Sequence, residues 1–183
     1  MKSVRFWAAV ALGAACILGD AVQAAPSPAP APEPTKPVDP RRYIGLWFEI
    51  ARLPNKLQVD CQAPTANWIK QGDGSFAITQ TCRQGSPSGP LKTWRAAGHI
   101  IDGSNNSKIR LGFFGGFIHQ DYWIIDRADD YSWCLMSTPT SKWLWIMARR
   151  PVVSSSLRAA LVARARNLGY DTTRLVYDQQ PPA

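Results

Sequence analysis

A chain of 183 residues is long enough for one domain with a substantial hydrophobic core. Its apolar content of 45% and charged content of 19% exclude an intrinsically disordered protein. The formal net charge of +8 comes from scattered Lys and Arg without a run of five like charges. This distribution favours a basic solvated surface over a nucleic-acid-binding segment, with weak attraction to anionic lipid head groups as the alternative.

The first 24 residues have the features of a secretory signal peptide. Lys2 and Arg5 form a positive start, an apolar stretch follows over residues 6–18, and Val22-Gln23-Ala24 is a small-x-small cleavage site. The apolar stretch is short for a membrane-spanning helix. We therefore expect residues 1–24 to be removed and the chain to be exported, either to the periplasm or to the outer membrane.

A second interpretation of this segment involves Cys16. Gly13-Ala14-Ala15-Cys16 is similar to the box of bacterial lipoproteins, in which the Cys becomes the lipid-bearing first residue, although Leu12 lies one position too early. Residues 25–37 are rich in proline and predict an extended, flexible linker, which suits a tethered domain or a disordered leader. Soluble export is the preferred prediction, and the lipid-anchored form remains the alternative.

Beyond the linker, short apolar and aromatic runs alternate with turn clusters as far as Met147. This spacing predicts an antiparallel β-sandwich or β-barrel. In the last run Trp143 and Trp145 share one face with Met147, and the other face is also apolar, as expected for a barrel strand covered by a helix. The eight expected strands are residues 46–53, 63–70, 75–83, 91–101, 107–114, 120–126, 131–137 and 143–149.

One helix is expected after the strands. Ser154 or Ser155 can cap its start and Gly169 can end it. Apolar residues recur at helical spacing and predict a face that packs on the barrel wall; they are Leu157, Leu161, Ala165 and Leu168. Residues 175–177 predict a short ninth strand, and residues 179–183 a loose tail.

Two cysteines flank a predicted hairpin. Cys61 and Cys82 lie on either side of the turn Gly72-Asp73-Gly74, in a chain whose export permits disulfides. A bridge between them would close a loop of roughly 20 residues and contribute about 3 kcal/mol. The register set by the turn requires a β-bulge for the two cysteines to face each other.

The sequence shows no catalytic or metal-binding constellation. Motifs such as Gly-x-Ser-x-Gly, a phosphate-binding glycine loop and His-Glu-x-x-His do not occur. The two histidines, His99 and His119, and the scattered cysteines do not form a metal site. We therefore expect no enzyme activity, no cofactor and no metal. Cys134 is interpreted as a buried apolar residue, and a Cys134-dependent enzyme is the less favoured alternative.

Three motifs occur in a fixed order. Residues 38–52 contain Gly45-x-Trp47, residues 121–126 read Asp-Tyr-Trp-Ile-Ile-Asp, and residues 143–151 end in Arg149-Arg-Pro just before the expected helix. Together they resemble the signature of the lipocalin family, and most closely its bacterial outer-membrane lipocalin and apolipoprotein D subgroup. The resemblance covers residues 38–180. It implies an all-β, eight-stranded antiparallel up-and-down barrel with the C-terminal helix on its outside.

The resemblance also implies roles for the motif residues. Trp47 should plug the closed end of the barrel beneath the guanidinium of Arg149, after the turn at Gly45. A planar guanidinium over an indole gains about 1–2 kcal/mol when desolvated. We assign these residues to structure and not to ligand binding.

Relatives in the family imply an apolar ligand such as a fatty acid or a lysophospholipid. The chain would bind, store or transport it in the cell envelope, with outer-membrane maintenance as one role. Arg52 or Lys56 would meet a charged head at the rim. The inward positions implied by the resemblance are Ala66, Trp68, Ile78, Gln80, Ala96, Ile100, Leu111, Phe113, Tyr122, Cys134, Trp143 and Trp145.

The sequence leaves one alternative from another class. If the inward side chains fill the barrel, the protein is a protein-interaction module that docks a partner through its proline-rich leader and its basic surface. The other partner predictions are peripheral or lipid-anchored membrane association, no nucleic acid, and a monomer or weak dimer.

Overall fold

The computed structural model describes residues 29–180. The predicted signal peptide and Cys16 lie outside this range. The strands are β1 (Gly45–Arg52), β2 (Cys61–Lys70), β3 (Phe76–Gln84), β4 (Leu91–Ile100), β5 (Lys108–Phe113), β6 (Ile118–Arg127), β7 (Trp133–Ser137), β8 (Leu144–Ala148) and β9 (Val176–Tyr177). The helices are α1 (Pro40–Tyr43) and α2 (Ser155–Asn167), with 3₁₀ turns η1 (Lys56–Gln58), η2 (Phe114–Gly116) and η3 (Thr172–Arg174).

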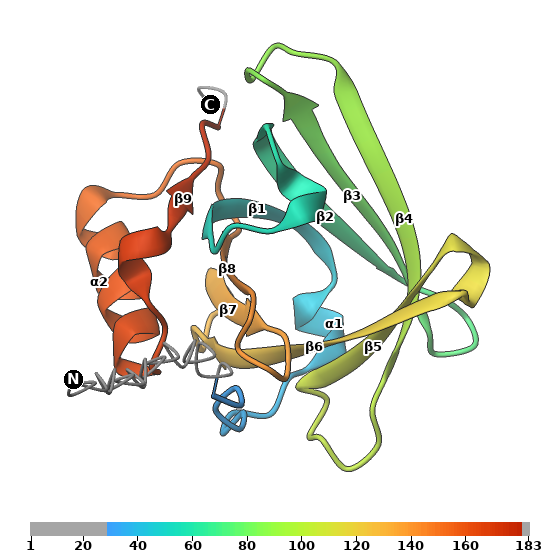
Figure 1. Cartoon of the computed structure of the whole chain (residues 1–183). Coiled ribbons are helices and arrows are strands. Elements are labelled where there is room, and N and C mark those ends of the chain that lie inside the picture. Colours follow the sequence, from blue (N-terminus) through green and yellow to red (C-terminus); the bar gives the residue numbers. More distant parts are fainter. Residues whose placement is uncertain (1–28, 181–183) are drawn as a thin grey trace, which may run out of the picture.

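Strands β1 to β8 form a closed antiparallel barrel (Figure 1). Each strand pairs with the next one in the chain, and β1 pairs with both β2 and β8. The short strand β9 pairs with the second half of β1. These observations confirm the predicted eight-stranded barrel and its additional ninth strand.

The barrel has a closed end and an open end. The closed end carries α1 and the loops of residues 71–75, 101–107 and 128–132. The open end carries the loops of residues 53–60, 85–90, 114–117 and 138–143. We call residues 53–60, which contain η1, the lid loop.

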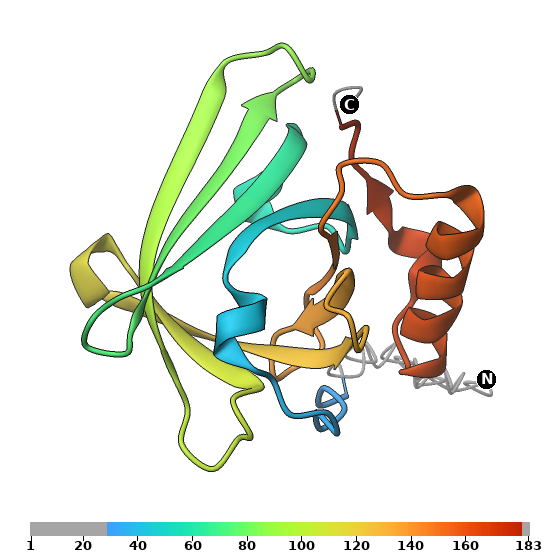
Figure 2. The ribbon, with the colours of Figure 1, turned by 180° about the vertical axis from the view of Figure 1, so that it is seen from behind.

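Helix α2 packs on the outer wall of the barrel, as predicted (Figure 2). The side chain of Ser154 caps its start by accepting a hydrogen bond from the Leu157 amide at 3.1 Å. Gly169 follows its end with a φ of +92°, a conformation that favours glycine. Leu161 and Ala165 are buried between the helix and the wall. The β8 strand is therefore apolar on both faces because each face contacts a hydrophobic core.

The N-terminal segment differs from the expected flexible linker over its described part. The amide of Ala31 donates to the Pro139 carbonyl at 2.8 Å, and Ala31 is buried. Lys36 Nζ donates to the Arg127 carbonyl at 2.8 Å and lies 3.3 Å from Asp126 Oδ1. The Pro37 carbonyl also accepts hydrogen bonds from the Arg127 guanidinium at 2.6 and 3.0 Å, so the segment packs along the barrel through both its backbone and its lysine.

The C-terminal tail also differs from expectation at Gln179 and Gln180. Strand β1 pairs with β2 only from Gly45 to Phe48, so beyond that point the backbone groups that β1 and β2 turn toward each other are not bonded between these two strands. The tail supplies hydrogen-bond partners at this place. The Ala63 amide donates to the Gln179 carbonyl at 2.9 Å, and Gln180 Nε2 donates to the Glu49 carbonyl at 2.8 Å.

The predicted disulfide between Cys61 and Cys82 is formed across β2 and β3, with the Cα atoms 5.5 Å apart. The expected bulge is present as a register shift between Gln62 and Thr65. Ala63 within it has a φ of +49°. This bulge makes β2 begin at Cys61, two residues before the predicted start.

Loss of this disulfide should destabilise the barrel strongly. Because the bridge spans 21 positions of sequence, the Cys61→Ser/Cys82→Ser double variant should lose about 3 kcal/mol of unfolding free energy. Urea denaturation followed by circular dichroism measures the loss. Complete reduction of the unmodified protein should lower its urea midpoint to about that of the double variant. An unchanged midpoint after complete reduction would contradict the prediction.

Candidate ligand-binding site

The floor of the barrel is built around Trp47. This residue is fully buried, and its Nε1 donates to the Tyr43 carbonyl at 2.8 Å. The guanidinium carbon of Arg149 lies 3.7 Å from the centroid of the Trp47 ring. The Arg149 guanidinium nitrogens also donate to carbonyls of the α1–β1 segment at 2.8–3.0 Å, namely those of Leu46, Arg42, Tyr43 and Ile44. The structure thus places the motif pair at the closed end, away from the open cavity.

Gly45 makes the turn from α1 into β1 with a φ of +95°. This left-handed conformation is unfavourable for other residues. A Cβ atom at this position would also lie 3.5 Å from Arg149 Nη1. The turn that leads from α1 to Trp47 at the floor therefore explains why the first motif has a glycine at this position.

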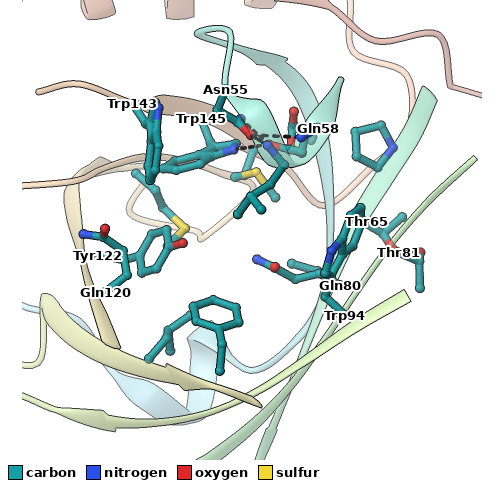
Figure 3. A pocket seen from close by; sticks show the side chains of 18 of the residues that line it. Asn55, Gln58, Thr65, Gln80, Thr81, Trp94, Gln120, Tyr122, Trp143 and Trp145 are labelled. Atoms are coloured by element: carbon teal, nitrogen blue, oxygen red, sulfur yellow. Dashed lines mark hydrogen bonds between the residues drawn. The ribbon is translucent and has the colours of Figure 1, made fainter. Parts of the chain in front are cut away.

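Above this floor lies a cavity of about 210 Å³ (Figure 3). Its lining is mainly aromatic and aliphatic, with carboxamide and hydroxyl groups between the apolar side chains. The lining residues are Glu49, Asn55, Leu57, Gln58, Pro64, Thr65, Ala66, Trp68, Gln80, Thr81, Trp94, Leu111, Phe113, Phe114, Ile118, Gln120, Tyr122, Met136, Trp143, Trp145 and Met147. The barrel is therefore not completely filled by its own side chains.

The polar groups of the cavity lie on opposite walls. Gln80 points into the space from β3, and Tyr122 faces it from β6 (Figure 3). Tyr122 packs against Trp145 with ring centroids 5.4 Å apart. Burial raises the pKa of Tyr122 to about 12, so its hydroxyl is neutral at pH 7 and can donate or accept one hydrogen bond.

Eight of the twelve predicted inward residues line the cavity. They are Ala66, Trp68, Gln80, Leu111, Phe113, Tyr122, Trp143 and Trp145. The other four do not: Ile78 and Cys134 are buried in the packed core, and Ala96 and Ile100 are partly buried against it. Large side chains such as Trp47 and Tyr43 fill this closed half, so the cavity occupies only the open half of the barrel.

Sequence reasoning missed two kinds of lining residue. Trp94, Met136 and Met147 lie on strands, and the alternation of inward and outward positions was the signal that could have found them. Asn55, Leu57 and Gln58 lie on the lid loop, which has no periodic pattern that would indicate their position.

Gln58 fixes the lid loop over the mouth. Its side-chain oxygen accepts hydrogen bonds from Asn55 Nδ2 at 2.6 Å and Trp145 Nε1 at 2.9 Å (Figure 3). Its Nε2 donates to Glu49 Oε2 at 2.8 Å. These contacts connect the lid loop to β1 and β8 at the border of the cavity.

A buried charge cluster lies beside the cavity. Arg52 is only 4% exposed; it pairs with Glu49 Oε1 at 3.1 Å and with Asp178. Arg52 is therefore not available to a ligand head group, contrary to expectation, whereas Lys56 is exposed on the lid. Burial, followed by the charge of Asp178, raises the pKa of Glu49 well above its usual value despite the opposing effect of Arg52.

The raised pKa of Glu49 predicts a pH-dependent stability. The folded protein keeps a proton that the unfolded chain releases, so this contribution is complete below the unfolded pKa, near 4.5, and is lost as pH rises toward the folded pKa. One such proton corresponds to a slope of at most about 1.4 kcal/mol per pH unit. Glu49→Gln should remove this slope while keeping an acceptor for Gln58.

Urea unfolding of both proteins from pH 5 to pH 8 measures this effect. The variant should become more stable relative to the unmodified protein as pH rises. Parallel stability curves would show that Glu49 does not bind the proton.

Cys134 lies in the packed core. Its side chain is fully buried, with Sγ 4.0 Å from the Tyr43 hydroxyl. Burial raises the pKa of Cys134 to about 12, so the thiol is protonated at pH 7. His99 and His119 are exposed on the outer wall. Within residues 29–180 no group of three or more His, Cys, Asp or Glu side chains is arranged to hold a metal ion.

No helix in the described part of the chain is both long and apolar enough to span a membrane.

Curated relatives match most of the chain. The outer membrane lipoprotein Blc of Vibrio cholerae serotype O1 is 29% identical over 149 residues, which cover 80% of this chain and 85% of that protein. The protein of the same name from Escherichia coli K12 is 26% identical over 158 residues, covering 86% and 88%. Temperature-induced lipocalin-1 of Arabidopsis thaliana is 26% identical over 147 residues, covering 76% and 78%.

Solved structures share the fold. Insecticyanin from the tobacco hornworm Manduca sexta superposes with a TM-score of 0.68 at 15% identity, covering 86% of this chain and 92% of that one. Lobster apocrustacyanin A1 gives a TM-score of 0.63 at 16% identity, covering 87% and 94%. A family model described as a lipocalin-like domain matches residues 38–180, most of the chain. This chain, with its barrel, its sealed floor and its outer helix, therefore belongs to the lipocalin family.

Proposed function

We propose that the protein binds one small lipid with an apolar chain, such as a fatty acid or a lysophospholipid, and stores or carries it in the cell envelope. The family binds small hydrophobic ligands. The observation that carries the proposal is the cavity of about 210 Å³, lined mainly by apolar side chains and bordered by the lid loop. The same cavity argues against the alternative of an interaction module with a filled barrel.

Burial of the apolar chain drives binding in this proposal. Each methylene removed from water contributes about 0.8 kcal/mol. The cavity is smaller than the roughly 300–1,000 Å³ typical of ligand pockets, so a long chain either displaces Gln58 or extends out of the mouth. Its polar head then remains outside, where Lys56 and Lys142 are exposed.

Tryptophan fluorescence provides a direct test, because Trp68, Trp94, Trp143 and Trp145 all line the cavity. Titration with a fatty acid and with a lysophospholipid should change the emission saturably, and native mass spectrometry should show one bound lipid per chain. A fluorescent fatty acid should be displaced by the preferred ligand. If neither lipid class produces saturable binding, the carrier function is rejected.

The chemistry of Cys134 favours this binding role over catalysis. A buried, protonated thiol without an adjacent histidine has no activated nucleophile. Cys134→Ser should therefore leave lipid binding unchanged, since the residue lies below the cavity.

We also propose that the chain acts after export, in the periplasm or at the outer membrane. The predicted signal peptide supports export, and two relatives are named outer membrane lipoproteins. Mass spectrometry of protein isolated from the cell envelope distinguishes cleavage near Ala24 from lipid attachment at Cys16. Protein retained in the cytosol with an intact N-terminus would contradict the proposal.

A further inference from the structure

The open end of the barrel carries a cluster of exposed apolar side chains, which we call the mouth rim. Phe117 is 91% exposed and Phe114 is 71% exposed. Three aliphatic residues complete the rim: Leu57 (55%), Val59 (68%) and Ile118 (55%). The protein therefore covers almost none of the Phe117 side chain. An exposed apolar cluster of this kind is typical of an interaction surface.

The mouth rim is continuous with the ligand cavity. It comes from two segments on the same end of the barrel, the lid loop and the β5–β6 turn. Leu57, Phe114 and Ile118 are exposed and also line the cavity. An apolar path therefore runs from the surface into the barrel interior.

The β5–β6 turn presents its aromatic residues through left-handed backbone. Phe114 has a φ of +53°, which is unfavourable for a bulky residue. Gly115 and Gly116 follow with φ values of +71° and +94°. A polar sequence would satisfy such a turn more readily, so the apolar side chains are not explained by the turn itself.

The open end has an excess of positive charge beside the mouth rim. Its loops contain two exposed lysines, Lys56 and Lys142, and one acidic residue, Asp60. The chain as a whole carries a formal net charge of +8. An anionic surface would therefore attract the protein, and the two lysines lie at the end of the barrel that carries the mouth rim.

We infer that the mouth rim docks the protein on an anionic phospholipid membrane. Aromatic and aliphatic side chains insert at the boundary between head groups and acyl chains, while lysines contact anionic head groups. Docked in this way, the cavity opens onto the bilayer, and an acyl chain passes between them without crossing water. The inference goes beyond the proposed ligand binding, and its test does not require a ligand.

Vesicle flotation tests the docking with mature protein and vesicles of phosphatidylcholine and phosphatidylglycerol at 3:1. The Phe114→Ser/Phe117→Ser variant should bind at least tenfold more weakly. The matched control Leu46→Ser/Val152→Ser removes two exposed apolar side chains elsewhere, 44% and 55% exposed, and should bind normally. All variants share the same mature N-terminus, so any contribution that it makes to binding is common to them.

A local probe reports rim insertion even if an N-terminal anchor holds the protein on the vesicle. An environment-sensitive dye is attached to the new thiol of Phe117→Cys or, as the control, of Val152→Cys. Lipid-borne quenchers should reduce the emission of the rim dye and leave that of the control dye unchanged. Equal quenching at both positions, or none at either, overturns the inference.

Two further measurements separate the alternatives. Replacing phosphatidylglycerol by phosphatidylcholine, or Lys56 and Lys142 by Gln, should weaken vesicle binding several-fold. Unchanged binding rejects an anionic partner.

If analytical ultracentrifugation without lipid shows a dimer that Phe117→Ser dissociates, the mouth rim is an interface between copies and the membrane assignment is wrong. Phe117 does not line the cavity, so Phe117→Ser should retain lipid binding and keep this test separate from that of the proposed function.

Discussion

Trp47→Ala should reduce the unfolding free energy by about 3–5 kcal/mol, the largest stability loss that we expect from one substitution. The side chain is fully buried and closes the floor of the barrel. Its removal leaves a void between α1 and the core and deprives Arg149 of the ring on which it stacks. Urea denaturation followed by near-ultraviolet circular dichroism measures both the loss and any loosening of the floor.

Substitutions of Arg149 separate the contribution of stacking on the Trp47 ring from that of the hydrogen bonds. Arg149→Lys keeps the positive charge but loses the planar group that reaches several carbonyls, so it should remain substantially destabilised. A double-mutant cycle of Trp47→Leu and Arg149→Met, which remove the ring and the cation respectively, should give a coupling of about 1–2 kcal/mol. Additive effects would show that stacking contributes nothing beyond the two separate sets of contacts.

Ala66→Phe should abolish lipid binding while preserving the fold. Ala66 lies on β2 opposite Trp47 and lines the cavity, so a phenyl ring at this position projects into the space that a ligand needs. The ring enters an existing cavity of about 210 Å³, which limits the cost of overpacking to about 1–3 kcal/mol. Tryptophan fluorescence titration and native mass spectrometry should show no bound lipid.

Ala97→Phe is the matched control. Ala97 is exposed on the outer face of β4, so the same substitution there should leave the cavity and lipid binding intact. Circular dichroism establishes that both variants are folded. If Ala66→Phe binds lipid as well as Ala97→Phe does, the ligand does not occupy the cavity.

These variants also mark the limit of what a strand pattern can predict. The resemblance implied that Ala66 and Ile78 are inward positions; both are buried in the barrel, but only Ala66 lines the cavity. The period of two residues determines the face of the sheet to which a side chain points. It does not determine the height along the barrel, which depends on strand register and on which large residues meet at the floor.

The sequence by itself determined the eight barrel strands, the outer helix, the Cys61–Cys82 pairing and the floor motif of Trp47 and Arg149. The strands, the helix and the cysteine pairing depend on periodicity and turn residues that are local in the chain. The contact between Trp47 and Arg149 was implied by the resemblance of their two motifs to the lipocalin signature. Only the tertiary structure decided the depth of the cavity, the hydrogen bonds of Gln58 at its border and the burial of Arg52 beside Glu49 and Asp178. The physical reason is that these features require segments more than 100 residues apart, or a loop without a period, to meet in space, and no local pattern encodes that meeting.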